Sequence, residues 1–300
     1  MQFNFIKYSK LYYTISGILV ILAIVSLFMF GLKFGIEFVG GSNMHVEFST
    51  QGNRPSNEAI KESLKVFNLG EIIVRSIGEN GVILQFKGVD EENHQQILSV
   101  LNEVSPMSEK SFQYVGASVG RELRNKTQLA IFLALIAITL YIAFAFRKVS
   151  KPVSSWKYGI TSLIALVHDV LIPIGVFSVL GKLYNIEITI PIVAALLTVL
   201  GFSVHDTIVI FDRLRENILR RGMGEFGDTV NISLNQTIGR SLSTSFTTLA
   251  VLVAIFFFGG ETLKYFSLAL ILGITLGTYS SLFLASPLLV SWQKIRSKKQ

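Results

Sequence analysis

The 300-residue sequence predicts a membrane all-α bundle of six transmembrane helices plus an extracytoplasmic α+β domain of the ferredoxin-like type. Half of the residues are hydrophobic, 16% are charged, and the mean hydropathy is +0.54. A soluble globular protein usually carries about a quarter charged residues. The charged residues are also unevenly placed, because apolar stretches alternate with short polar connections and with one long polar segment, 33–126.

Six stretches are long enough to cross a bilayer, which requires roughly 20 apolar residues. Asp169 and Asp206 are their only Asp, Glu, Lys or Arg residues. The expected helices cover about 11–30, 127–146, 159–180, 188–211, 241–258 and 265–290. The first stretch follows Lys7 and Lys10, as in a signal sequence. It is longer than the apolar core of a signal peptide and no Ala-x-Ala-like site follows, so we expect an uncleaved anchor.

Positive residues predict the orientation, because cytoplasmic loops carry an excess of Lys and Arg. Segment 147–158 has Arg147, Lys148, Lys151 and Lys157 without an acid, and the end of the chain has Lys294, Arg296, Lys298 and Lys299 without one. Both should be cytoplasmic, and six spans then place the N-terminus there too. The predicted parts are the N-terminal segment and first helix (1–32), the extracytoplasmic domain (33–126), helices two to six (127–290) with a cytoplasmic loop (212–240), and a basic cytoplasmic tail (291–300).

The outer segment has 10 basic and 12 acidic residues and the pattern of a folded domain. Asn80-Gly81 separates two strand-like runs, 71–77 and 82–87, and predicts a hairpin in which both turn residues adopt positive φ. Two further strands are expected at 44–50 and 111–117.

Two helices are expected between these strands. Apolar residues recur at helical spacing at 60, 64 and 67, after the start signal Pro55-Ser56. They recur again at 97, 101 and 104, between Asp90 and Pro106. The predicted order is therefore β-α-β-β-α-β, as in a ferredoxin-like fold.

The predicted cytoplasmic loop contains a second helical pattern. Phe226, Val230, Leu234 and Ile238 recur every fourth residue among polar residues. Such a segment is typical of a helix that lies flat on the membrane surface. A short connector fits the same segment equally well.

Asp206 is the first candidate for chemistry, because an ionisable group inside hydrocarbon costs several kcal/mol and needs a partner, water or a function. It shares a helical stripe with Ser203 and Thr207, and lies six residues before Asp212, so about 9 Å inside the cytoplasmic end of its helix. A carboxylate whose partner comes and goes would load and release protons. A static buried hydrogen bond is the alternative.

Arg240 is the candidate partner, at the start of the fifth span. Six hydroxyl residues follow it within 241–248. With Thr207 from the fourth span, we expect Thr244, Thr247 and Thr248 to line a hydrated path. The alternatives are that Arg240 snorkels to the membrane interface and that the hydroxyls serve close helix packing.

His168-Asp169 in the third span repeats the pair His205-Asp206 of the fourth. It could form a second relay station or a polar tie between helices. The tie is favoured, because no second charged partner for Asp169 lies in a neighbouring span.

Several familiar sites are absent from the sequence. There is no G-x-x-x-x-G-K-[ST] phosphate loop, no H-E-x-x-H and no G-x-S-x-G. The chain has no cysteine, and its four histidines are scattered singly. We therefore expect no enzyme, no catalytic residue, no cofactor and no metal, with an ion gradient as the source of energy. The net charge of +7 comes without a basic stripe interleaved with aromatics, so nucleic acid is not expected as a partner, whereas membrane lipid is.

Longer motifs resemble the SecF subunits of the SecD/SecF family of bacterial protein export, within the RND (resistance–nodulation–division) superfamily. The resemblance covers nearly the whole chain, and the block in the fourth span is long and specific. The motifs are Phe38–Gly41, Ala117–Leu123, Ala165–Val170, Gly201–Asn217 and Asn235–Thr248.

The resemblance implies a function and partners. SecF pairs with SecD beside the SecYEG channel, with YajC as a further subunit, and uses proton or sodium flow to help pull unfolded preproteins across the bacterial inner membrane. By the motif match, Asp206 and Arg240 fall on the intramembrane acid and arginine of the family, and SecD supplies a further acid. The residue before the acid is usually Asn, and here it is His205, which could tune Asp206 or join the relay.

Two other functions remain open from the sequence. The first is one half of an RND-type small-molecule exporter, against which the small outer segment argues. The second is a non-conducting structural subunit of a membrane complex, in which Asp206 only holds helices together.

Overall fold

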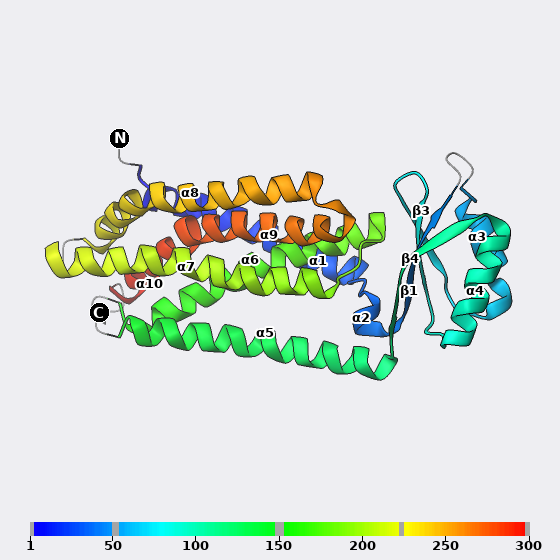
Figure 1. Cartoon of the computed structure of the whole chain (residues 1–300). Helices are drawn as coiled ribbons and strands as arrows, with labels where there is room; N and C mark the ends of the chain where they lie inside the picture. The colour runs from blue at the N-terminus through cyan, green and yellow to red at the C-terminus, as the bar shows by residue number, and fades with distance from the viewer. Residues whose placement is uncertain (1–2, 50–53, 148–152, 222–224, 298–300) are drawn as a thin grey trace. The chain divides into compact units, whose positions relative to one another are not determined.

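The computed structural model describes residues 3–49, 54–147, 153–221 and 225–297 (Figure 1). The chain divides into two compact units, which are a helical unit (1–33 and 129–300) and a sheet unit (34–128). Lys148, Lys151, Lys298 and Lys299, which contribute to the predicted orientation, lie outside the described residues, as does Thr50 at the end of the first expected strand.

Six helices among the described residues are long and apolar enough to cross a membrane, as the sequence predicts. The chain enters the first through a short 3₁₀ turn, Ile6–Tyr8. The helices are α1 (Ser9–Phe30), α5 (Ala117–Ala145), α6 (Ser155–Tyr184), α7 (Ile190–Arg221), α8 (Phe226–Phe258), and α9 (Gly260–Ser280), which continues through a π-helical turn (Ser281–Ala285) into α10 (Ser286–Ser297).

The core of the helical unit gathers on α6, α7 and the end of the chain. Phe146, Tyr158 and Phe211 form an aromatic cluster whose ring centroids lie 5.1–5.8 Å apart. Small residues bring α1 against α6, since a Cβ added to Gly175 would lie 2.5 Å from the Cβ of Ala23. By contrast, α5 and α8 expose long faces in this chain.

Both alternatives for residues 226–238, a separate helix on the membrane surface and a short connector, are wrong. Residues 226–238 are the first turns of the 33-residue helix α8, and α7 likewise extends to Arg221, so most of the predicted loop 212–240 is helical. The apolar stripe of this segment packs into the bundle, because Val230 and Leu234 are at most 1% exposed. The fourfold spacing identified a buried helix face, and periodicity alone cannot tell a membrane surface from a protein core.

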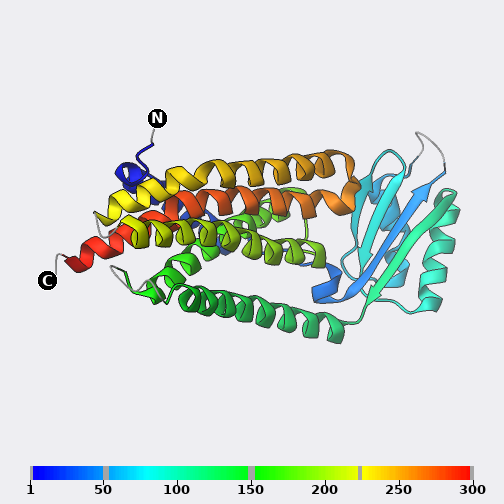
Figure 2. The same ribbon diagram turned by 60° about the vertical axis from the view of Figure 1, so that its left-hand side comes forward.

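The sheet unit is ferredoxin-like, as predicted. Its strands are β1 (Gly41–Phe48), β2 (Ile73–Ile77), β3 (Gly81–Phe86) and β4 (Met107–Val115), joined in the antiparallel order β2-β3-β1-β4. The short helix α2 (Ile36–Val39) leads into β1, while α3 (Asn57–Ser63) and α4 (Glu91–Val104) pack on one face of the sheet (Figure 2). Both predicted start signals act as caps, since the Ser56 and Asp90 side chains accept backbone N–H groups at 3.1 and 3.0 Å.

Three details of this unit differ from the predictions. Gly81 is already paired with Ile77 in the strand ladder, so the hairpin turn comprises residues 78–80. The residue with positive φ in this turn is Gly78. The first helix ends at Ser63, and Phe67 lies in a 3₁₀ turn (Lys65–Phe67). Strand β4 begins at Met107 rather than at 111, because its polar first half lies on an exposed edge strand.

Gly40 and Gly41 join α2 to β1 with φ angles of +82° and +139°. The start of α5 packs against this junction. A Cβ added to Gly40 would lie 2.7 Å from the Cα of Ala117, and one added to Gly120 would lie 2.9 Å from the backbone nitrogen of Gly40. Glycine is therefore required by both the backbone conformation and the close approach.

Candidate relay site in the helix bundle

Asp206 lies in the middle of α7 and is 4% exposed. Among the described residues, its Oδ2 atom has no hydrogen-bond partner. The hydroxyl groups of Ser241 in α8 and Thr278 in α9 lie close enough to interact with its carboxylate. The Ser241 hydroxyl is also buried without a partner, whereas Thr278 donates to the Ile274 carbonyl oxygen at 3.0 Å. The site therefore holds a buried carboxylate with unused capacity to accept a hydrogen bond or a proton.

Arg240 and His205 are the charged or titratable neighbours that act on this carboxylate. Both side chains are exposed in this chain. No ion pair between Asp206 and Arg240 is found among the described residues. The predicted partner thus lies near the acid without neutralising it by direct contact.

The hydroxyl groups predicted to line a hydrated path do not all lie on one common surface. Thr207 is buried, and its hydroxyl bonds to the Ser203 carbonyl oxygen at 3.1 Å and to Ser281 Oγ at 2.8 Å. Thr244 and Thr247 lie on the exposed face of α8, and Thr248 is half-buried. Their hydroxyls donate to carbonyl oxygens one turn earlier at 3.0 Å, so in this chain they line a surface next to Arg240.

The second pair, His168-Asp169, has a different environment. Asp169 is fully buried and accepts three hydrogen bonds, each from a different side chain. Its Oδ2 accepts from the hydroxyls of Ser203 and Ser280 at 2.6 Å, and its Oδ1 lies 2.9 Å from Nδ1 of His168. The carboxylate therefore joins α6 to both α7 and α9.

Ser280 and Ser281 were not singled out from the sequence. Ser280 ends α9, and Ser281 begins the π-helical turn, where its hydroxyl also donates to the Ser203 carbonyl oxygen at 3.3 Å. Such turns are frequent at functional sites. Two adjacent serines within an apolar span were the available signal. Ser280 thus bonds to Asp169, and Ser281 bonds to Thr207, the residue that follows Asp206.

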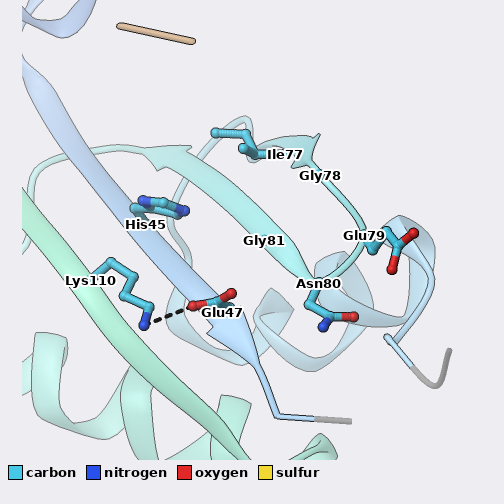
Figure 3. A pocket seen from close by; sticks show the side chains of 8 residues that line it. All are labelled: His45, Glu47, Ile77, Gly78, Glu79, Asn80, Gly81 and Lys110. Atoms are coloured by element: carbon cyan, nitrogen blue, oxygen red, sulfur yellow. Dashed lines mark ion pairs between the residues drawn. The ribbon is translucent and has the colours of Figure 1, made fainter. Parts of the chain in front are cut away.

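A separate hollow of about 560 Å³ opens on the face of the sheet that α3 and α4 leave uncovered (Figure 3). It lies over Gly81, which has no side chain, and is lined by residues of β1, β4 and the β2–β3 hairpin. Glu47 and Lys110 form an ion pair across it at 2.7 Å, and the hydrogen bond from Lys110 lowers the pKa of Glu47 below its ordinary value. None of the residues predicted to act in the relay lies there.

Comparisons with known proteins agree over nearly the whole chain. Residues 96–295 match the family model "Protein export membrane protein SecD/SecF, C-terminal", and residues 25–51 match the "SecD/SecF GG Motif". The protein translocase subunit SecF of Thermobaculum terrenum is 43% identical over 97% of this chain and 94% of its own length. The same subunit of Rhodothermus marinus is 37% identical over 96% of this chain and 92% of its own length.

Solved structures of SecDF share the fold. The crystal structure of SecDF, a translocon-associated membrane protein from Thermus thermophilus, superposes with a TM-score of 0.84 at 32% identity over 98% of this chain. A second SecDF structure, in a form described as super-membrane-facing, gives 0.71 at 31% identity over the full chain. This chain spans 39% of the length of the first solved chain and 40% of the second. On the family models and the identity to the translocase subunits, the chain belongs to the SecF branch of the SecD/SecF protein export family.

Proposed function

We propose that this subunit couples proton or sodium flow across the bacterial inner membrane to a late stage of preprotein translocation. In this proposal the N- and C-termini are cytoplasmic and residues 33–126 lie outside, as the excess of Lys and Arg in the other connections indicates. The ion gradient supplies the energy, since one charge crossing 100 mV releases about 2.3 kcal/mol.

SecD is the proposed partner. The two solved SecDF chains are much longer than this one, and this chain accounts for about two fifths of each. We propose that a separate SecD chain supplies the remainder, and that the pair acts on unfolded preproteins beside SecYEG, with YajC as a further subunit.

The free oxygen of Asp206 carries the proposal. A buried carboxylate without a fixed partner is costly in a membrane protein, so its presence favours a functional role. Because Oδ2 of Asp206 has no partner among the described residues, it can take up a proton or contact a cation without breaking an existing bond.

The exposed face formed by α7 and α8 is the proposed contact with SecD. His205, Arg240, Thr244 and Thr247 are exposed here, although all four lie within or beside predicted spans. Burial against SecD would lower the local dielectric constant. This would strengthen the attraction of Arg240 to the carboxylate of Asp206 and to the further acid that SecD supplies. The relay would then be complete only in the complex, with proton or cation binding to Asp206 releasing Arg240 and letting the helices shift.

Asp206→Asn tests this proposal in membranes that contain the whole Sec complex. We expect the gradient-driven stage of export and the accompanying ion flux to be lost, while SecD still co-purifies. Asp206→Glu is the matched control and should retain part of both activities. Export and ion flux at the wild-type rate in Asp206→Asn would rule out the relay. Loss of SecD binding would instead support a structural subunit.

A second experiment addresses the substrate. Cysteines placed singly on the exposed positions of β4 should cross-link to a stalled, partly exported polypeptide, since the chain has no cysteine of its own. A consistent lack of adducts would argue against a pulling role for the outer domain.

A further inference from the structure

The segment that precedes α1 is bound along the side of α8. The backbone N–H of Phe3 donates to Oδ1 of Asn235 at 2.9 Å, and Nδ2 of Asn235 donates back to the Phe3 carbonyl oxygen at 2.8 Å. One turn earlier, Oδ1 of Asn231 accepts the backbone N–H of Phe5 at 2.8 Å. Two asparagines on one helix face thus bind the backbone of residues 3–5, a contact that the predicted relay does not use.

Phe5 fixes this segment from its other side. Its ring is 1% exposed, and it packs at a centroid distance of 5.7 Å against Phe283 in the π-helical turn. Residues 3–5 therefore connect the first half of α8 to the turn that contacts Thr207 through Ser281.

The same stretch of α8 is also bound by α7. The buried side chain of Asn217 donates to Ser233 Oγ at 2.8 Å and to Gln236 Oε1 at 2.9 Å. Arg213 donates to the same Gln236 oxygen at 2.7 Å. Residues 231–236 are thus held on two sides, whereas the side chains of Arg240, Ser243 and Thr244 just beyond them are exposed.

We propose that Asn235, assisted by Asn231, is a positioning residue that clamps α8 to residues 3–5 and so determines where Arg240 lies relative to Asp206. Arg240 is five residues beyond Asn235, about 7.5 Å along the helix. The clamp forms a fixed point from which the exposed part of α8 can move. This inference rests on the proposed relay for its purpose, but not for its geometry.

The two asparagines make different demands on substitution. Toward the described residues, the Asn231 side chain bonds only through its Oδ1 oxygen, so aspartate, which keeps that acceptor, can replace it. Asn235 also uses Nδ2, which donates to the Phe3 carbonyl oxygen and to the Asn231 carbonyl oxygen at 2.8 Å. Asn235→Asp loses both donor bonds and places a carboxylate against two carbonyl oxygens.

The test compares Asn231→Asp with Asn235→Asp in the full-length protein, co-expressed with SecD. Each variant carries Ser243→Cys, which is the only thiol because the chain has no cysteine. A second series carries Val253→Cys instead, an exposed position three helical turns further along α8. The measurements are the rate of thiol labelling in membranes and the hydrogen exchange of the amides of residues 3–9.

Asn235→Asp should accelerate labelling at position 243 about fivefold or more and expose the amides of residues 3–9, while labelling at position 253 stays within about twofold of the parent rate. Asn231→Asp should match the parent at both positions. The clamp is overturned if the two variants label position 243 alike, or if Asn235→Asp changes both positions equally, since that would indicate general loosening.

The relay is judged separately, by export in Asp206→Asn. Wild-type export in that variant would show that the clamp does not serve a relay, but it would leave the labelling result unaffected. A difference between the two asparagine variants would still establish the clamp.

Discussion

Two His-Asp pairs lie in neighbouring helices of the bundle, and their surroundings differ. Asp169 in α6 accepts bonds from Ser203, Ser280 and His168. Asp206 in α7 keeps an oxygen with no partner among the described residues. The same dipeptide thus forms a structural tie in one helix and an available acceptor in the next.

The difference arises from the hydroxyls that face each acid. Ser203 and Ser280 point their hydroxyls at Asp169, whereas Thr278, near Asp206, donates to a backbone carbonyl and bonds to Ser245. A buried acid whose acceptors are filled resists any change of partner, while one with a free oxygen can change partner at little cost. The division of labour between the two pairs follows from this difference.

The largest expected effect is on folding, from Asp169→Ala. The change leaves the Ser203 hydroxyl and the His168 imidazole without their acceptor, while the Ser280 hydroxyl keeps the Gly277 carbonyl oxygen at 3.2 Å. Each unsatisfied buried group costs about 1–3 kcal/mol, so we expect a loss of about 2 kcal/mol or more. The unfolding midpoint in detergent measures it, with Asp206→Ala as the matched control, expected within about 1 kcal/mol of the parent. Equal losses in the two variants would abolish the distinction between them.

The next effect is on transport, from the isosteric pair Asp206→Asn and Asp169→Asn. Asparagine keeps one oxygen for the hydroxyls around position 169 but cannot ionise at position 206. Gradient-driven export should fall about tenfold or more in the first variant, equivalent to about 1.4 kcal/mol, and less than about threefold in the second. The opposite order would assign the relay to Asp169.

A smaller effect should follow from removing a single donor. Ser280→Ala deletes one bond to Asp169 and should cost about 1–2 kcal/mol of stability. In a double-mutant cycle with Asp169→Asn, the two losses should be non-additive by about 0.5 kcal/mol or more, because the residues share a bond. Strict additivity would show that this bond contributes nothing.

The smallest effect is expected at Glu47, an exposed carboxylate with which the two buried carboxylates can be compared. Lys110 lowers the pKa of Glu47 below the ordinary value of 4.5. The ion pair therefore contributes its full stability above about pH 4.5, and the contribution is lost as the pH falls through the folded-state pKa. Glu47→Gln should slightly reduce this acid dependence of unfolding, and about 1 M salt should mask the difference because the pair is exposed. A salt-independent difference would point to another cause.

Much of the fold was accessible from the sequence, because its signals are local. Apolar length predicts the six helices, and the Ser56 and Asp90 caps predict the helices of the sheet unit. The conformation of the hairpin turn was missed, because Asn80-Gly81 suggested a two-residue turn and ladder pairing placed Gly81 in the strand instead. The position of the 226–238 helix was missed because a buried face and a membrane-facing one share the same periodicity.

Only part of the candidate site could be predicted from the sequence. Asp206, Arg240 and Asp169 stand out because charged residues are rare in apolar spans. The donors that distinguish the two acids come from residues 34 and 111 positions away from Asp169, and the asparagine contacts to residues 3–5 span 226 and 232 positions. Single serines and asparagines carry no signal of such distant pairing until the helices are packed.

Infrared difference spectroscopy tests the central claim most directly, by following the carboxyl C=O stretch of the reconstituted complex when an ion gradient is imposed. We predict a gradient-dependent band that persists in Asp169→Asn and disappears in Asp206→Asn. A band that survives in Asp206→Asn and disappears in Asp169→Asn would contradict the account.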